Sequence, residues 1–110
     1  MSKDRDPHKA VDYIIANAGK FAAAKAERVY IEEFRKSKKA LLMAQSPAEA
    51  ANAREQYAYS HADYLALLDG LKAAVEVEEK LRWDLVAAQA RVEIWRTEQA
   101  NNRHQDKVMA

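Results

Sequence analysis

The longest regular pattern of apolar residues runs from Tyr64 to Trp95 and repeats every seven residues. It forms two seams, three residues apart: Tyr64, Leu71, Glu78, Leu85 and Val92, and Leu67, Ala74, Leu81, Ala88 and Trp95. An apolar repeat of this period without proline is typical of a long helix that packs along another helix. The pattern therefore predicts a long amphipathic helix over about residues 61–101.

Capping signals divide the rest of the chain. Asp6-Pro7 places an acid before a proline at the first helical position, which predicts a helix over about residues 7–45. Ser46-Pro47-Ala48-Glu49 has the form of a capping box and predicts a short helix over about residues 47–58. Ser60-His61-Ala62-Asp63 is a looser version of the same signal and opens the long helix. Without a break there, the second and third helices would form one continuous rod.

These helices predict an all-α fold, a long antiparallel helical hairpin of the coiled-coil type with a short connecting helix. Residues 7–102 form a single helical domain in this scheme, residues 1–6 a disordered N-terminal tail and residues 103–110 a polar C-terminal tail. Two paired helices bury one stripe each, and a chain of 110 residues in this arrangement gains little core. We therefore expect the fold to be completed by oligomerisation.

The first helix carries two apolar faces. The broader one consists of Ile15, Ala18, Ala22, Ala26, Val29, Tyr30, Phe34, Leu41 and Ala44. A second edge, confined to the N-terminal half, consists of Tyr13, Ile14, Phe21 and Ala24. The third helix also has a surplus apolar face, on the side away from its seams: Trp83, Val86, Ala87, Ala90 and Ile94.

An antiparallel hairpin brings the second edge and the surplus face together at its open end. Together they are too large to leave in water. We predict self-association through an interface of Phe21, Tyr13, Ile14, Trp83, Val86, Ala90 and Ile94. A helix from another protein, or the short second helix folding back, would cover the same surface.

Glu78 is the one acid inside the apolar seams. An ionised carboxylate in an apolar stripe is costly unless it is paired, and one polar seam position can fix helix register. Antiparallel pairing places Glu78 near Lys25 and Arg28, which predicts a buried or half-buried ion pair. The alternatives are an acid rotated into solvent and, more remotely, a catalytic acid.

The basic residues of the first helix gather at Arg35, Lys36, Lys38 and Lys39. Such a cluster can bind a nucleic-acid backbone through its phosphates, without sequence preference. The other interpretation is a solvated helix surface whose lysines pair with Glu32 and Glu33. A formal net charge of +1 favours the second interpretation.

No pattern of catalytic residues is present in the sequence. Cysteine is absent, and His8, His61 and His104 are isolated from the acids and histidines that would complete a helical metal site. The chain has two glycines and no glycine-rich phosphate loop. We therefore expect no enzymatic activity, no cofactor, no metal, no small-molecule substrate and no membrane association, and a cytoplasmic location.

Two parts of the chain resemble small, mostly uncharacterised helical proteins of tailed phages and prophages. They are AKAERVYIEEFRKSKKALLM at residues 24–43, and the stretch from Leu81-Arg82-Trp83 to Val92-Glu93-Ile94-Trp95-Arg96. Many such proteins are encoded near recombination and replication genes. The resemblance implies a non-catalytic adaptor, accessory to DNA recombination or replication in the host cytoplasm, with a phage or host protein as partner. Direct nucleic-acid binding and inhibition of a host protein are the alternative functions.

Overall fold

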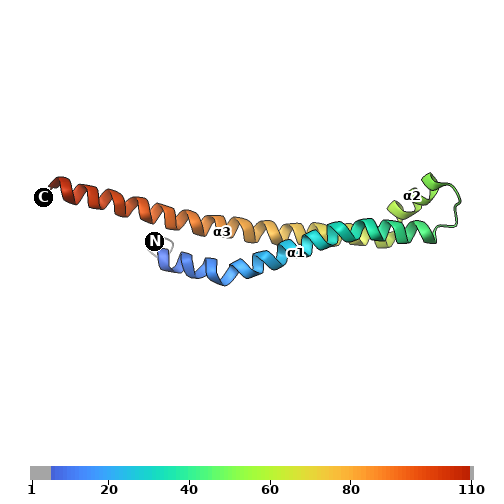
Figure 1. Ribbon diagram of the computed structural model, residues 1–110, viewed down its shortest axis with the longest axis horizontal. Helices are drawn as coiled ribbons and strands as arrows, with labels where there is room; N and C mark the ends of the chain where they lie inside the picture. The colour runs from blue at the N-terminus through green and yellow to red at the C-terminus, as the bar shows by residue number, and fades with distance from the viewer. Residues whose placement is uncertain (1–5, 110) are drawn as a thin grey trace. The chain divides into compact units, whose positions relative to one another are not determined.

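The computed structural model describes residues 6–109, which fold into three α-helices and no strand. They are α1 (Pro7–Gln45), α2 (Ala51–Ser60) and α3 (Ala62–Met109) (Figure 1). The predicted all-α hairpin with a short connecting helix is confirmed. Its completion by oligomerisation stays a prediction. Most of the predicted N-terminal tail lies outside the described residues.

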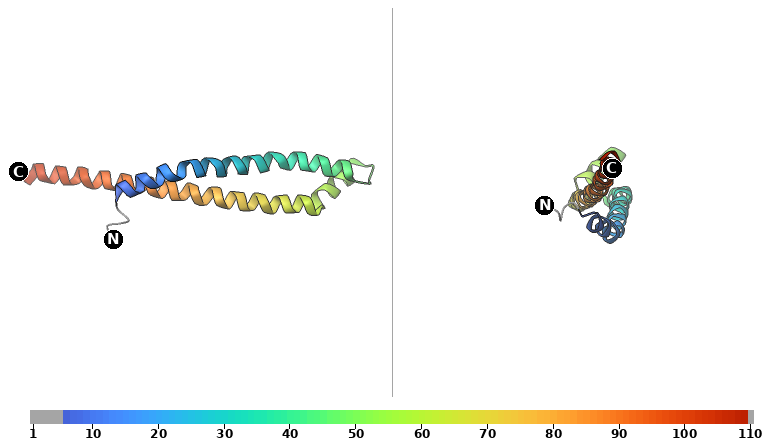
Figure 2. Two further views of the ribbon diagram at one scale, coloured as in Figure 1. Left: turned by 90° about the horizontal axis from the view of Figure 1, so that it is seen from below. Right: turned by 90° about the vertical axis from the view of Figure 1, so that its left-hand side faces the viewer.

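The chain divides into two compact units. The central unit is Ala22–Glu79, and the terminal unit combines the described residues up to Phe21 with those from Lys80 onward. In the central unit, α1 and α3 run side by side with α2 at their shared end (Figures 1 and 2). Arg28 contacts Glu78 and Lys38 contacts Asp63, so the two helices are antiparallel.

The start of α1 agrees with its capping signal. Oδ1 of Asp6 accepts a hydrogen bond from the backbone N–H of His8 at 2.9 Å, and the Asp6 carbonyl accepts one from Ala10 at 3.2 Å. Pro7 occupies the first helical position, where its missing N–H costs no hydrogen bond. The helix ends at Gln45, as predicted.

The predicted start of the second helix at Pro47 is wrong, because α2 begins at Ala51. Oγ of Ser46 accepts the N–H of Ala48 at 3.2 Å and so closes a local turn instead of capping a helix. Nε of Arg54 donates to the Ala48 carbonyl at 2.8 Å, which ties this turn to α2. Ala50 then enters the helix in an extended conformation, with φ −70° and ψ 138°.

The break between α2 and α3 lies at His61, whose φ of −67° and ψ of 139° are extended. The two helices are therefore separate. Ser60 does not cap α3, because its hydroxyl donates back to the Gln56 carbonyl at 2.7 Å. Nδ1 of His61 accepts the N–H of Asp63 at 3.0 Å and takes the capping role.

The predicted end of the long helix near Asn101 is also wrong. Helix α3 continues to Met109 and includes most of the predicted polar tail. Asn101 and Asn102 are exposed and are followed by neither glycine nor proline. Asparagine in a helix costs less than about 0.7 kcal/mol relative to alanine, so two of them do not stop it.

The seams predicted for α3 are confirmed, because each of their members except Trp95 is buried or half-buried. The face predicted for α1 is wrong. All nine residues of its broader face are exposed, including Ile15 at 72% and Tyr30 at 65%.

Helix α1 instead buries two seams of seven-residue period that include polar residues. Their members, all buried or half-buried, are Ala10, Asn17, Ala24, Ile31 and Lys38, and Ile14, Phe21, Arg28, Arg35 and Leu42. A helix in a hairpin buries one stripe. This stripe brings Arg28 to the acid in the α3 seam, which the more apolar face could not do.

The buried core of the central unit lies where its three helices meet. Leu42 from α1 and Ala58 from α2 are fully buried, and Tyr64 from α3 is 7% exposed. Met43 and Leu68 pack against this cluster. The Tyr59 and Tyr64 rings meet edge to face, with centroids 5.3 Å apart. This cluster packs the turn against the end of α1 and the start of α3.

Candidate interaction surfaces

An ion pair crosses the seam of the central unit between Arg28 of α1 and Glu78 of α3. Nε of Arg28 donates to Oε1 of Glu78, and Nη2 donates to Oε2 at 3.2 Å. Nη1 of the same guanidinium donates to Glu32 at 3.0 Å, one turn along α1. The hydrogen bond to Glu78, followed by the one to Glu32, raises the pKa of Arg28 above its usual value.

Glu78 itself is 8% exposed, so the alternative of an acid rotated into solvent is wrong. The predicted contact with Arg28 is confirmed, whereas Lys25 is exposed. A planar guanidinium that meets both carboxylate oxygens fixes distance and angle together. This pair therefore sets the alignment of the two helices, as one polar seam position does in coiled coils.

The surplus face of α3 lies on the surface of the terminal unit. Trp83 is 59% exposed, Val86 40% and Ile94 55%, and Ala90 between them is exposed as well. Ala88, which is fully buried, marks the opposite, packed side of the helix. The Arg82 guanidinium lies over the Trp83 ring, 4.5 Å from its centroid. The four residues Trp83, Val86, Ala90 and Ile94 are called the outer stripe below.

Tyr13, Ile14 and Phe21 were predicted to join this face, and the structure does not place them there. All three are half-buried, and Ile14 and Phe21 belong to the packed seam of α1. Tyr13 lies at Asp84 of α3. The hydrogen bond from Lys80, at 2.8 Å, lowers the pKa of the Asp84 carboxyl, and a weaker hydrogen bond from Tyr13 lowers it further.

The basic cluster of α1 is largely neutralised by acids. Lys36 pairs with Glu33 at 3.3 Å, Lys38 with Asp63 at 3.8 Å and Lys39 with Glu55 at 3.1 Å. These contacts favour the interpretation of a solvated, paired surface. Lys36 finds the glutamate next to it on α1, whereas Lys38 and Lys39 reach across to α3 and α2.

Arg35, the fourth basic residue, differs from the lysines. It is half-buried in the α1 seam, and no ion pair or hydrogen bond is found for its side chain within residues 6–109. It lines a surface hollow of about 430 Å³ together with Lys36, Lys39, Tyr59 and Tyr64. The sequence alone did not connect the two tyrosines with the basic cluster, because they lie on other helices, α2 and α3.

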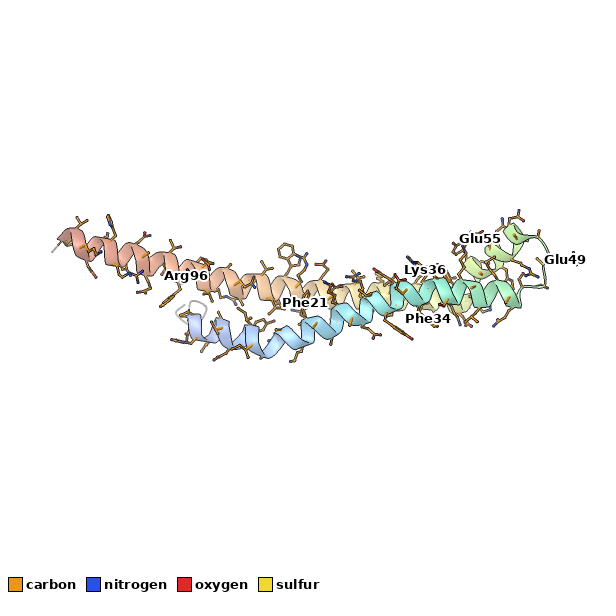
Figure 3. The ribbon with its side chains drawn as sticks, viewed as in Figure 1. Phe21, Phe34, Lys36, Glu49, Glu55 and Arg96 are labelled. Carbon is orange, nitrogen blue, oxygen red and sulfur yellow. The ribbon has the colours of Figure 1, made fainter. Side chains whose placement is uncertain are left out.

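A second hollow, of about 370 Å³, lies between α1 and α3 of the central unit. Small side chains open it, and its lining is Ala24, Glu27, Ile31, Gly70, Ala73, Ala74 and Val77. On the outer side of α1, the Tyr30 and Phe34 rings stack with centroids 6.1 Å apart. Figure 3 shows Phe34 pointing outward from α1, on the opposite side from Lys36.

Within residues 6–109, no three histidine, aspartate or glutamate side chains lie close enough together to hold a metal ion. None of the helices in this part of the chain has an apolar stretch long enough to cross a membrane. Comparisons of the chain with protein-family models, with curated proteins and with solved structures find no match. The resemblance to phage proteins therefore stays a prediction.

Proposed function

We propose that this protein is a non-catalytic helical interaction protein that self-associates through the outer stripe of α3. The observation that carries the proposal is the exposure of a large aromatic and two aliphatic side chains on one stripe, opposite the packed face of the same helix. Exposed apolar stripes of this kind mark protein interfaces, and tryptophan is enriched among the residues that dominate binding energy.

Self-association fits the terminal unit because two helices alone leave that stripe in water. A stable interface buries about 800 Å² on each partner. The four stripe residues would form its apolar centre, with Arg82 and the neighbouring charged residues as the rim. Helices of two chains that pack along one another through such a stripe would repeat the helix-on-helix packing that α1 and α3 make within one chain.

The biological setting that we propose rests on the sequence resemblance. The protein would act in the cytoplasm of a phage host as an adaptor accessory to DNA recombination or replication. In this role it presents a helical surface to a phage or host protein and performs no chemistry of its own.

Light scattering coupled to size exclusion tests self-association, at several concentrations and at low and high salt. We expect a dimer or larger assembly that persists at high salt, since apolar burial is not screened. Trp83→Glu and Ile94→Glu should each convert it to a monomer without loss of helix content. Leu65→Glu is the matched control: it adds the same charge at an apolar residue 49% exposed on α3 of the central unit. A wild-type monomer, or an assembly unaffected by both stripe variants, would refute the proposal.

A further inference from the structure

All but one of the polar residues in the α1 seams have a hydrogen-bond or ion-pair partner among residues 6–109. The Asn17 amide donates to the Tyr13 carbonyl at 2.8 Å, Arg28 pairs with Glu78, and Lys38 pairs with Asp63. Only Arg35 lacks an acid or a hydrogen-bond acceptor among residues 6–109. A half-buried cation is normally paired, because removing it from water costs free energy that a counter-charge offsets. The missing acceptor points to an anion from outside the chain.

The residues around Arg35 indicate which kind of anion would bind there. The described residues that line the hollow with it are two further cations, Lys36 and Lys39, and two tyrosines, and no acid is among them. Its volume of about 430 Å³ falls in the range of small-ligand sites. Three cations suit a phosphate, and a tyrosine ring suits a flat aromatic group. The two together suit a nucleotide.

The side chains that line the hollow differ in how freely they can contact a bound ligand. Within residues 6–109, Lys36 bonds only to Glu33, and both side chains are largely exposed, at 74% and 68%, so that pair is weak. Lys39 is held by Glu55 and lies over the Tyr59 ring, 4.6 Å from its centroid. Tyr59 is still 43% exposed, which leaves ring surface for a base, while the buried Tyr64 also lines the hollow.

We infer that this hollow binds one nucleotide of a single-stranded nucleic acid. The phosphate lies on Arg35 and Lys36, and the base stacks on the exposed part of Tyr59. In duplexes the bases are stacked on one another and are not free to lie against a side chain, so single strands are preferred. This site is independent of the outer stripe, and it is more restricted than a general basic surface because it requires Tyr59.

Fluorescence anisotropy of a labelled oligothymidylate with the full chain tests the site, over about 50 to 200 mM salt. We expect Arg35→Gln to weaken binding about tenfold. It should also reduce the slope of log affinity against log salt by about 0.7, the value for one phosphate contact on a single strand. Tyr59→Leu should weaken binding about tenfold at an unchanged slope, because stacking involves no counterion. Lys72→Gln, an exposed lysine on α3 outside the hollow, removes the same charge and should change little.

Lys36→Gln provides a second variant that cannot disturb the fold, because its side chain is 74% exposed. Like Arg35→Gln, it should reduce both the affinity and the slope of log affinity against log salt. Equal losses from Lys36→Gln and Lys72→Gln would show diffuse attraction and overturn the site. Absence of binding by the wild type at low salt, or preference for duplex over single strand, would overturn it as well.

Discussion

The central and terminal units are built from the same two long helices, but they differ in how many side chains are buried between those helices. In the central unit, α2 adds a third surface, and Leu42, Ala58 and Tyr64 are buried together where the helices meet. Among the described residues of the terminal unit, the fully packed ones are two alanines, Ala10 and Ala88, while Trp83 and Ile94 are exposed. The central unit therefore has a buried core within one chain, although apolar side chains such as Tyr30 and Val77 are exposed on its surface. The terminal unit has more apolar surface than two helices can bury, which is why we expect a second chain there.

The two units also differ in how polar residues are used. In the central unit, Arg28–Glu78, Lys38–Asp63 and Lys39–Glu55 all join different helices. In the terminal unit, Lys80–Asp84 and Glu93–Arg96 lie within α3. Ion pairs within one helix support that helix but do not select its partner. The ion pairs between helices are therefore those of the central unit, whereas in the terminal unit the hydrogen bond from Tyr13 to Asp84 joins α1 to α3.

The largest expected effect is the removal of the core of the central unit. Leu42→Ala leaves a cavity beside Ala58 and Tyr64, and we expect the free energy of unfolding to fall by about 2–5 kcal/mol. The matched control is Leu41→Ala, one residue earlier and 54% exposed, which should change it by less than about 0.5 kcal/mol. Urea unfolding measures both. Similar losses in the two variants would contradict the assignment of the core to this turn.

A smaller effect should follow from breaking the pair across the seam. Arg28→Leu leaves the Glu78 carboxylate buried without its main counter-charge, so the midpoint of thermal unfolding should fall by several degrees. Lys25→Leu, one turn away and exposed, is the control and should shift it far less. Because a buried pair replaced by apolar residues is often neutral or stabilising, Arg28→Leu with Glu78→Leu should recover the lost stability. A double variant no better than Arg28→Leu would count against a direct coupling between the two residues.

The smallest effect concerns Asp84 of the terminal unit. Its pKa is lowered, chiefly by the hydrogen bond from Lys80, so the carboxylate contributes stability above its unfolded pKa of about 3.9. That contribution is lost as the pH falls through the lower folded pKa. Carbon-detected NMR titration should show the Asp84 carboxyl titrating below the ordinary value for an aspartate. In Lys80→Met, Asp84 should titrate closer to its ordinary value; an unchanged midpoint would exclude Lys80 as the cause.

The packed face of α3 could be predicted from the sequence, whereas the packed face of α1 was predicted wrongly. The seams of α3 are almost wholly apolar, so their period could be seen directly, and Glu78 stood out as the single exception. The seams of α1 contain Asn17, Arg28, Arg35 and Lys38, and these polar residues hid an equally regular repeat. The more apolar face of α1, which includes Ile15 and Tyr30, attracted the prediction and is exposed in the structure.

The errors at the helix ends have a similar origin. Ser46 and Ser60 have side chains suited to capping, yet each makes a different local hydrogen bond, and the sequence contains no information on which bond a hydroxyl selects. The hollow around Arg35 could not be predicted for another reason. It combines residues from three helices, and the tyrosines enter it only once the turn has brought α2 and α3 against α1.

The matched seams of α1 and α3 also restrict how the length of this chain can change during evolution. A single residue inserted between Arg28 and Leu42 would rotate every following seam residue by about 100° and bring exposed side chains into the packed stripe. Seven residues lost from α1 would keep that phase, but would pull the turn out of step with Glu78 unless seven were lost from α3 as well. We therefore expect homologous chains to differ in this region by paired steps of one heptad, with single insertions and deletions collected in residues 46–50, between α1 and α2.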